Sequence, residues 1–531
     1  MKAALQAPGL YYEAVKPPAE PSPLRSDVAG FIGRTRRGPV GTAVRVTGWR
    51  EYMITFGGLA ADADTPSALK GYFENGGDVV HLVRLFGLPP SANPGDGVAW
   101  ASWSLSGPSV GRTWSGWSPQ QGGFTTTSYR IVATSPGVWA NGLRVKPQYR
   151  QRGASGLPEV DLVACANGEP IEHLIGLDPG QLVLQVADRS ALIRLESGAQ
   201  ITPNIGGGPR LLHWDDVVLG MGADFAVTGT DYLAALDRLA DEPEVALVVL
   251  PDLVNDADPG SAANIQKQAI AQADALHDRL VLVDLPAPDL ASSAAASWAQ
   301  VFRGSDPDEN LRAAVAYYPW LCVQDPLGGT ARPLRTIAPC GHVAGLISRY
   351  DRERGAHYTA TNATLDNVID IATGYALSER AALNEAGINL LRCAPGRGIQ
   401  VWGGRTLHKD PHGDDQGRLY IAHRRLIHRL IRAIRQVAEP LVFETNGPVM
   451  WLTLARAVTT ILAEAYVGGG LKGARPEQAF RVRCDATTNP LEEIELGRVL
   501  CEIDLAPAVP MEFITLRVAL SASGTLDVFE K

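Results

Sequence analysis

A stretch near the end of the chain, Phe480–Val518, constrains the fold more than any other. Apolar residues alternate with polar ones there in three short runs, which begin at Phe480, Val499 and Ile514. Alternation with a period of two is typical of a β-strand that buries one face. Segments that contain proline separate the runs. The stretch therefore predicts a small three-stranded sheet whose edges are open to further strands.

The length and charge of the chain narrow its class. A chain of 531 residues is too long for one ordinary hydrophobic core and predicts about three domains. Hydrophobic residues make up 45% and charged residues 20%, which is typical of a folded globular protein. With 57 acidic and 48 basic side chains, the formal net charge is −9. This balance argues against a general nucleic-acid-binding protein, although it is compatible with a local basic face.

The sequence also bears on the cellular compartment. Its six cysteines are scattered, without a Cys-x-x-Cys pair or the spacing of a metal site, which favours buried reduced thiols over disulfides. The first residues lack the apolar core of a secretory signal. No run approaches the roughly 20 apolar residues of a membrane span. We therefore expect a chain that is made and assembled in the cytoplasm and is not inserted into a membrane.

The first 26 residues predict an extended arm. Closely spaced prolines exclude a helix there, while the short run Leu10–Val15 is able to pair as one strand. On composition alone, a disordered tail is the alternative.

Residues 89–205 predict a β-rich domain that is inserted into the preceding one. Glycine, serine, threonine and tryptophan dominate this stretch, and short β-like runs occur at Val160–Ala164 and Leu182–Val186. Four tryptophans are close together in its sequence: Trp100, Trp103, Trp114 and Trp117. We expect these tryptophans to fill the core of a small glycine-rich sheet. A platform on which carbohydrate stacks is the less common alternative.

Between Leu211 and Val401 the pattern changes to α/β. Apolar runs at Ala246–Leu250, Leu280–Leu285 and Ala314–Tyr318 alternate with helix-like segments, which is the rhythm of a parallel sheet. The residue types of a hydrolase are present in Asp252, Asp284, His277 and Ser261. However, the stretch lacks the Gly-x-Ser-x-Gly turn that presents a nucleophilic serine. We therefore predict no catalytic residues, and a hydrolase remains the competing hypothesis.

A basic helix is predicted at Tyr420–Val437. Its apolar residues form a stripe at helical spacing, and five arginines crowd the remaining surface: Arg424, Arg425, Arg429, Arg432 and Arg435. A basic face of this kind is usually just solvated, but the mutual repulsion of five arginines indicates an acidic counterpart. A second helix is expected to begin with Asn446 as its cap and Pro448 in its first turn.

The polar loop before the basic helix contains His408, His412, Asp414 and Asp415. These residue types can bind a metal, but no regular spacing brings them together. We therefore interpret the loop as a linker and predict no metal site and no cofactor.

Several phrases give the chain a family resemblance. In the C-terminal stretch these are RCDATTNP and PMEFITLRV, and upstream they include SPGVWANGLRV at 135–145, LNEAGIN at 383–389 and PGRGIQVWGGRTL at 395–407. In wording and order they resemble the tail sheath proteins of contractile phage tails and related contractile injection systems. The resemblance covers about residues 7–84, 135–145 and 339–518.

The resemblance implies a mixed α/β and α+β multidomain fold. Its expected parts are an N-terminal arm at 1–26, a subtilisin-like α/β domain at 27–88 plus 206–408, the inserted β-rich domain at 89–205 and a C-terminal α+β domain at 409–531. It also implies contacts between subunits through the arm and the last predicted strand, made by Leu10, Tyr11, Tyr12, Glu13, Ala14, Val15, Phe513, Ile514, Thr515, Leu516, Arg517 and Val518.

The implied function is structural. The family forms hexameric rings that stack into a helical cylinder around an inner tube, attach to a baseplate and contract to drive the tube through a target envelope. The resemblance thus implies further copies of the chain, a tube protein, a baseplate and a tail terminator or cap as partners. It also implies that the five arginines face the tube. An enzyme, either a subtilisin-fold hydrolase or a glycan-active protein that uses the tryptophans, is the alternative.

Overall fold

The computed structural model describes residues 25–87, 97–108, 124–151, 158–178, 180–201, 216–304, 309–409, 416–508, 514–520 and 526–530. The chain divides into two compact units, Ser26–His428 and Arg429–Lys531, and the boundary falls within one helix, α11 (Ile421–Ala438). Within the described ranges, no helix has the length and apolar character needed to cross a membrane.

An eight-stranded sheet organises the first unit, with the order β18-β17-β13-β12-β11-β1-β3-β2. Its strands are β1 (Val28–Arg34), β2 (Ala43–Val46), β3 (Val80–Leu85), β11 (Val245–Val249), β12 (Leu280–Val283), β13 (Ala314–Tyr318), β17 (Ile388–Ala394) and β18 (Gly398–Trp402). The six strands from β17 to β3 are parallel, and β2 and β18 are antiparallel edges. From β1 the chain continues to β3 on one side, whereas β11 and the later strands extend the sheet on the other.

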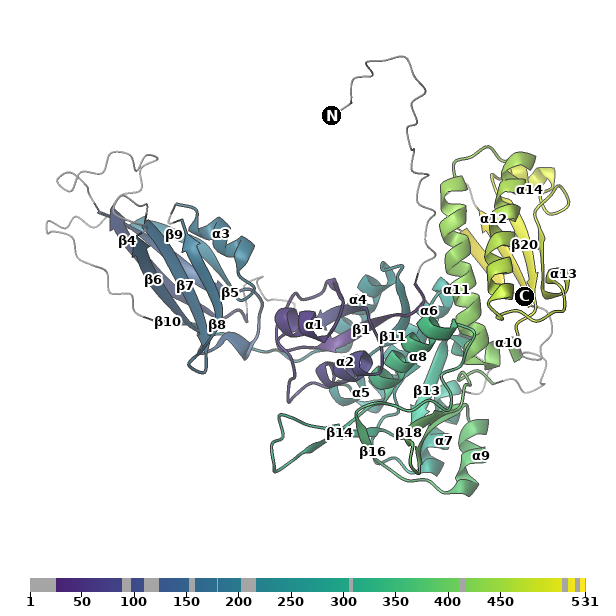
Figure 1. Ribbon diagram of the computed structural model, residues 1–531, viewed down its shortest axis with the longest axis horizontal. Coiled ribbons are helices and arrows are strands. Elements are labelled where there is room, and N and C mark those ends of the chain that lie inside the picture. The colour runs from purple at the N-terminus through teal and green to yellow at the C-terminus, as the bar shows by residue number, and fades with distance from the viewer. Residues whose placement is uncertain are drawn as a thin grey trace, which may run out of the picture. The chain divides into compact units, whose positions relative to one another are not determined.

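Helices cover both faces of this sheet (Figure 1). One face carries α1 (Trp49–Phe56), α2 (Thr65–Glu74) and α8 (Cys340–Arg354); the other carries α4 (Gly229–Ala240), α6 (Pro259–Leu276), α7 (Ser292–Arg303) and α9 (Arg380–Glu385). In β1, Phe31 packs into the first core and the next residue, Ile32, into the second, and both are 0% exposed. Burial on both faces explains why these strands read as continuous apolar runs.

Smaller elements complete this part of the unit. A three-stranded antiparallel sheet contains β14 (Leu321–Gln324), β15 (Leu334–Ile337) and β16 (Val368–Ile371). Short helices are α5 (Leu253–Asp256), which follows β11, and α10 (Gln416–Leu419).

The stretch between β3 and α4 is rich in strands, as expected. One antiparallel sheet contains β6 (Arg144–Gln151), β7 (Pro158–Ala166), β8 (Glu169–Leu177) and β10 (Val217–Val218); the other contains β4 (Trp100–Pro108), β5 (Phe124–Ala133) and β9 (Ile193–Ile201). Both sheets and α3 (Leu182–Arg189) contribute side chains to one shared core. The large sheet joins β3 to β11 through β1, so this stretch interrupts the α/β pattern in sequence.

The second unit contains a four-stranded antiparallel sheet with the order β19-β20-β21-β22. Its elements are α12 (Pro448–Val467), α13 (Pro476–Ala479), β19 (Phe480–Arg483), α14 (Leu491–Glu495), β20 (Val499–Leu505), β21 (Ile514–Leu520) and β22 (Leu526–Glu530). α12 packs on β19 and β20 through a stripe that includes Trp451, Leu454 and Val458. The three strands predicted from alternation are confirmed, and in β20 every second residue is buried.

Two local predictions differ from the structure, and one strand was missed. Leu182–Val186, expected as a strand, begins helix α3, because Leu182 and Val186 are buried one turn apart while Leu184 is 73% exposed. Asn446 does not cap α12; the cap position is Gly447, and the Asn446 side chain bonds instead to the Arg498 carbonyl and the Trp451 indole. Strand β22 was not predicted. The mixed α/β multidomain fold is confirmed.

Candidate functional site

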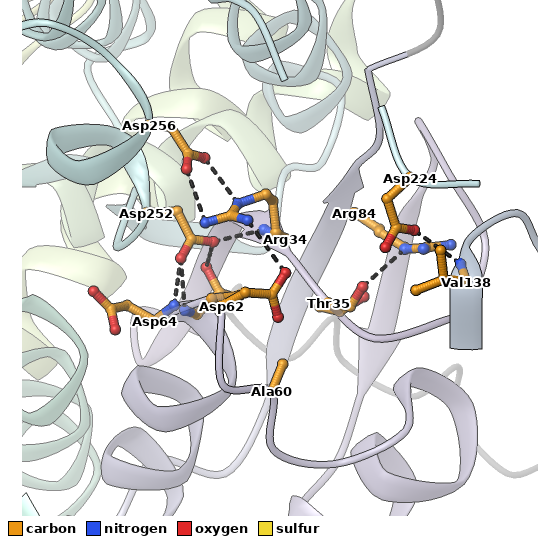
Figure 2. A network of polar contacts seen from close by, with 12 residues as sticks. Arg34, Thr35, Ala60, Asp62, Asp64, Arg84, Val138, Asp224, Asp252 and Asp256 are labelled. Atoms are coloured by element: carbon orange, nitrogen blue, oxygen red, sulfur yellow. Dashed lines mark hydrogen bonds and ion pairs between the residues drawn. The ribbon is translucent and has the colours of Figure 1, made fainter. Parts of the chain in front are cut away.

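Asp252 lies at the point where the strand order reverses. In open α/β sheets, the crevice outside the carboxyl ends of strands at such a point commonly binds ligands. Asp252 follows β11 there and is 1% exposed. Its carboxylate accepts hydrogen bonds from the backbone N–H groups of Arg34 (2.6 Å), Asp64 (2.5 Å) and Thr65 (3.2 Å) and from the Thr65 hydroxyl (2.7 Å). Figure 2 shows this carboxylate between the end of β1 and the start of α2.

Two of these N–H donors belong to the N-terminus of α2. A helix N-terminus has unpaired N–H groups and the positive end of the helix dipole, so it readily binds an anion. The Asp252 carboxylate occupies this position. Gly33 makes the approach possible, because a Cβ atom at this residue would lie 1.8 Å from Thr65 Oγ1 and 2.7 Å from Asp252 Oδ2. The place where a ligand would bind is therefore filled by the chain's own carboxylate.

The Arg34 side chain extends the network on one side. Its guanidinium contacts the Asp256 carboxylate through two nitrogens, at 3.1 and 2.9 Å, and lies 3.5 Å from Asp62. Burial opposes the charge of Arg34, but Asp252, Asp256 and Asp62 outweigh it and raise its pKa. Burial raises the pKa of Asp256, against the effect of Arg34. The Tyr232 hydroxyl donates a further hydrogen bond to Asp256, at 2.9 Å.

Arg335, on β15, extends the network on the other side. Its Nε and Nη2 donate to Asp64 Oδ1 at 3.0 and 2.6 Å, and Asn255 donates to Asp64 Oδ2 at 2.6 Å. Burial raises the pKa of Asp64, and Arg335 counteracts it. Sequence reasoning singled out Asp252 but missed Arg34 and Arg335. The local signal for Arg34 was its place directly after a glycine at a strand end, whereas Arg335 follows Leu334 and had no such signal. The whole arrangement joins β1, α2, α5 and β15.

Another arginine, which is buried, lies nearby in Figure 2. Arg84, at 2% exposure, donates to backbone carbonyls of Thr35 (3.3 Å), Gly38 (2.8 Å) and Pro136 (3.0 Å). Burial lowers the pKa of Arg84 to about 10, and Asp224 counteracts this effect. Asp224 also accepts a hydrogen bond from the N–H of Val138, at 3.0 Å. Arg84 thus fixes the SPGVWANGLRV segment against the loop after β1.

The residues considered for a hydrolase do not form one site. Asp252 and Asp284 follow β11 and β12 at the carboxyl edge of the sheet. His277 ends α6 just before β12, so it lies at the opposite, amino edge. The N–H of Ser261 bonds to Asp258 in the first turn of α6, at 3.1 Å. A triad needs hydrogen-bonded contact between its members, which this placement does not provide.

Asp284 allows a test by pH. Burial raises the pKa of this carboxyl to about 7, although a hydrogen bond from Cys340 opposes the shift. The unfolded value is about 3.9, so the folded state holds the proton more tightly. The resulting stabilisation is complete below that value and is lost as the pH rises through 7.

We therefore expect Asp284→Asn, which cannot ionise, to gain stability relative to the parent chain as the pH rises from 4 to 8. Urea-induced unfolding at several pH values measures the difference. Asp289→Asn, an exposed aspartate in the same loop, is the matched control. A constant difference between Asp284→Asn and the parent over this range would contradict the interpretation.

The arginines of α11 are less accessible than the sequence led us to expect. The expectation of a solvent-accessible basic face is wrong for three of them, because Arg424 (0% exposed), Arg425 (4%) and Arg432 (1%) are buried. Arg429 is exposed and Arg435 is partly exposed. The expectation failed because it considered only acids near the helix in sequence, whereas Arg425 pairs with Asp351 on α8.

Arg425 binds the residues that lead into β1. Its Nη2 contacts the Asp351 carboxylate and donates to the Ser26 carbonyl at 2.7 Å. The next residue, Asp27, accepts through its backbone carbonyl from the Tyr72 hydroxyl at 3.1 Å, and its side chain lies 3.5 Å from Arg352. We call Arg425, Asp351, Tyr72 and Arg352 the arm-root clamp. It holds the residues from which the predicted arm departs.

The predicted contact strands are only partly within the described residues. Leu10–Val15 and Phe513 lie outside them, whereas residues 514–518 belong to β21. β21 pairs with β20 and β22 of the same chain, so among the described strands β19 and β22 form the edges of this sheet. The contacts between subunits remain a prediction.

The tryptophans and the histidine loop give no assembled binding site among the described residues. Trp100 is 36% exposed, with the Arg130 guanidinium 4.3 Å from its ring centroid. Trp114, Trp117 and residues 410–415 lie outside the described part of the chain, as does the side chain of Trp103. Within the described part, no group of three or more His, Cys, Asp or Glu residues is placed to hold a metal.

Comparison with a family model identifies the α/β region. Residues 226–407 match the model described as the phage tail sheath protein central domain. This region therefore resembles phage tail sheath proteins. The resemblance seen in the sequence is thereby confirmed, and it extends to curated sheath proteins.

Two curated tail sheath proteins align with the chain. That of Vibrio phage KVP40 is 25% identical over 328 residues, and that of Enterobacteria phage T4 is 23% identical over 325 residues. Each alignment covers 57% of this chain and 46% of the relative. The chain thus spans about half the length of the curated relatives it matches.

Solved sheath proteins share the fold. A sheath tail protein from Listeria innocua has a TM-score of 0.65 at 11% identity, covering 94% of this chain and 96% of that protein. One from Desulfitobacterium hafniense has a TM-score of 0.61 at 13% identity, covering 97% and 100%. The contracted helical sheath of the anti-feeding prophage gives 0.55 at 20% identity, covering 96% and 98%.

Proposed function

We propose that this chain is a structural subunit of a contractile sheath. Copies assemble as stacked hexameric rings around an inner tube, and the sheath contracts to drive the tube through a target envelope. The observation that supports this most is the match of residues 226–407 to the sheath central domain. The fold match, which covers 96% or more of two solved sheath proteins, also supports it.

The proposed partners are other copies of the chain, an inner tube protein, a baseplate and a tail terminator or cap. Solved relatives include a chain from the baseplate of the anti-feeding prophage and sheath subunits in the contracted state, which supports association with a baseplate and with other subunits. We propose assembly in the cytoplasm, as part of a phage tail or a tail-like particle.

We also propose the subtilisin-like topology and the domain boundaries given above for the first unit. Six parallel strands with helices on both faces support the topology. A structural role is favoured over a hydrolase because the chain's own carboxylate fills the crevice at Asp252 and because His277 lies at the other edge of the sheet. No cofactor is part of the proposal, since the energy of contraction is stored in the assembly.

Electron microscopy tests the function. The chain is produced together with the products of its neighbouring genes, purified and imaged. Long striated cylinders are the expected result. Monodisperse monomers that hydrolyse a peptide or glycan substrate would contradict the proposal and support the enzyme.

The N-terminal arm is expected to be essential for assembly. Deletion of residues 1–24 should leave a folded monomer that forms no cylinders, because strand addition to a neighbour's open edge supplies main-chain hydrogen bonds that rings repeat at high effective concentration. Arg25 and Ser26 are kept so that the arm-root clamp remains intact. Circular dichroism checks the fold, and electron microscopy counts cylinders.

A length-matched variant separates strand pairing by the arm from the effect of the arm's length alone. In this variant, Leu10–Val15 is replaced by glycine and serine and the rest of the arm is retained. It should fail to assemble like the deletion. Normal cylinders from either variant would show that the arm is dispensable.

The accessible arginines of α11 are proposed to meet acidic side chains of the tube. Exposed ion pairs contribute about 0–1 kcal/mol each, so they release readily when the sheath widens. The double variant Arg429→Glu, Arg435→Glu should fold normally but form more cylinders that lack a tube, and raised salt should act on the parent in the same direction. The matched control is Arg456→Glu, an exposed arginine on α12. Equal tube occupancy in the parent, the double variant and the control would show that other residues contact the tube.

A further inference from the structure

Two cysteines lie opposite each other on neighbouring strands in the second unit. β19 and β20 are antiparallel, and Arg483 lies opposite Glu502. The next residues in this register are Cys484 and Cys501, and each thiol shifts the pKa of the other. Residues directly opposite each other in an antiparallel pair have Cα atoms about 4.5–5.5 Å apart. That separation falls within the range of about 4.4–6.8 Å that a disulfide spans.

Asn489 holds Cys484 in place beside β20. The Asn489 side chain is 2% exposed and bonds to both backbone groups of Leu500: its Nδ2 donates to the carbonyl at 3.0 Å and its Oδ1 accepts from the N–H at 2.6 Å. The same Nδ2 donates to the Asp485 carbonyl at 3.1 Å and lies 4.0 Å from Cys484 Sγ. The RCDATTNP phrase thus folds into a closed loop that keeps the first thiol next to the strand that carries the second.

The two thiols have different environments. Cys484 is partly exposed, whereas Cys501 is 0% exposed. The hydrogen bond from Cys501 lowers the pKa of Cys484, with burial opposing and Asn489 assisting. The same hydrogen bond, together with burial, raises the pKa of Cys501. Because the thiolate is the nucleophile in disulfide exchange, Cys484 is the thiol that reacts first.

We propose that Cys484 and Cys501 are a thiol–disulfide exchange site that closes into a cross-strand disulfide. The Cys484 thiolate attacks one sulfur of a low-molecular-weight disulfide such as oxidised glutathione and expels one glutathione thiolate. Cys501 then gives its proton to the solvent, attacks Cys484 Sγ in the mixed disulfide and expels the second glutathione thiolate. The two cysteines are oxidised, and one glutathione disulfide is reduced to two thiols.

The bond would join the edge strand β19 to β20 and close the loop formed by residues 485–500. Among the described strands β19 lies at an edge of the sheet, so the disulfide fixes a strand that pairs there with β20 alone. This inference concerns the chain alone and does not depend on the proposed function.

The test treats the folded full-length chain with oxidised glutathione, blocks the remaining thiols and analyses the proteolytic peptides without reduction by mass spectrometry. We expect a linked peptide pair containing Cys484 and Cys501 in most molecules, with the mass reduced by two hydrogens. Cys393, which is exposed, is the internal control and should carry glutathione or remain a thiol.

Two variants separate the steps. Cys501→Ser should trap a stable glutathione adduct on Cys484, because no resolving thiol is present. Cys484→Ser should leave Cys501 unmodified while Cys393 still reacts. The proposal is overturned if the parent chain accumulates a stable adduct on Cys484, or if Cys393 reacts while both Cys484 and Cys501 remain thiols.

Discussion

Arg425→Met should lower the free energy of unfolding by about 3–5 kcal/mol. The Arg425 guanidinium contacts the Asp351 carboxylate, and their side chains are only 4% and 3% exposed. Removing the arginine leaves a buried carboxylate without this cation, which costs more than the loss of an exposed ion pair. It also removes the donor to the Ser26 carbonyl. Urea-induced unfolding, followed by tryptophan fluorescence, measures the change.

Matched variants separate the clamp from a general effect of charge. Arg429→Met, one turn further along the same helix and exposed, should change the free energy by no more than about 0.5 kcal/mol. Arg425→Lys keeps the charge but loses the planar fork, so its cost should be intermediate. Adding Asp351→Asn to Arg425→Met should recover part of the loss. Equal stability of Arg425→Met and Arg429→Met would disprove the clamp.

The clamp also explains why local sequence patterns failed at α11. An arginine on a helix surface is usually solvated, and α11 itself contains no acidic residue to indicate otherwise. The partner of Arg425 is 74 residues away in sequence, on α8, and its second acceptor, Ser26, is 399 residues away. Periodicity identifies which residues share a helix face but not what packs against that face. The helix was therefore predictable, and the burial of its arginines was not.

The strands were predictable for the opposite reason. In β20 the alternation of Val499, Cys501, Ile503 and Leu505 is produced by one buried face and requires no knowledge of the partner strand. β22 is shorter, with five residues against seven in β20, and its run LDVFE follows a serine- and glycine-containing stretch. α3 was misread because LVLQV satisfies both periods, and only the exposure of Leu184 distinguishes them.

The sequence predicted only one part of the network at Asp252, namely the aspartate and not its donors. An aspartate after a buried strand is expected at the carboxyl edge of a parallel sheet, and this edge is where α/β enzymes place catalytic groups. The donors to Asp252 come from residues 187 to 218 positions away. Only the fold shows that these donors satisfy the carboxylate and that it occupies the helix terminus itself. An aspartate at the carboxyl edge of a sheet was therefore insufficient to establish a catalytic site.

Asp252→Ala should lower the free energy of unfolding by about 4 kcal/mol. The carboxylate accepts three backbone hydrogen bonds and one from a hydroxyl, and a buried donor that loses its partner costs about 1–3 kcal/mol. Asp252→Asn should recover only part of this loss, because its amide keeps one acceptor oxygen but turns an NH2 group toward a backbone N–H donor. Asp62→Asn is the control: its side chain is 78% exposed and 3.5 Å from Arg34, so a change of about 0.5 kcal/mol or less is expected.

The outcome at Asp252 also discriminates between the two functional hypotheses. A catalytic carboxylate is held in place for its reaction, and its replacement by asparagine usually abolishes turnover while the fold persists. A carboxylate that anchors the N-terminus of α2 behaves differently, because the N–H groups of Asp64 and Thr65 lose their acceptor in the folded state. Hydrogen exchange in α2 should then accelerate in both Asp252 variants and remain unchanged in Asp62→Asn. Full stability of Asp252→Asn, with unchanged exchange in α2, would remove the structural explanation and reopen the hydrolase.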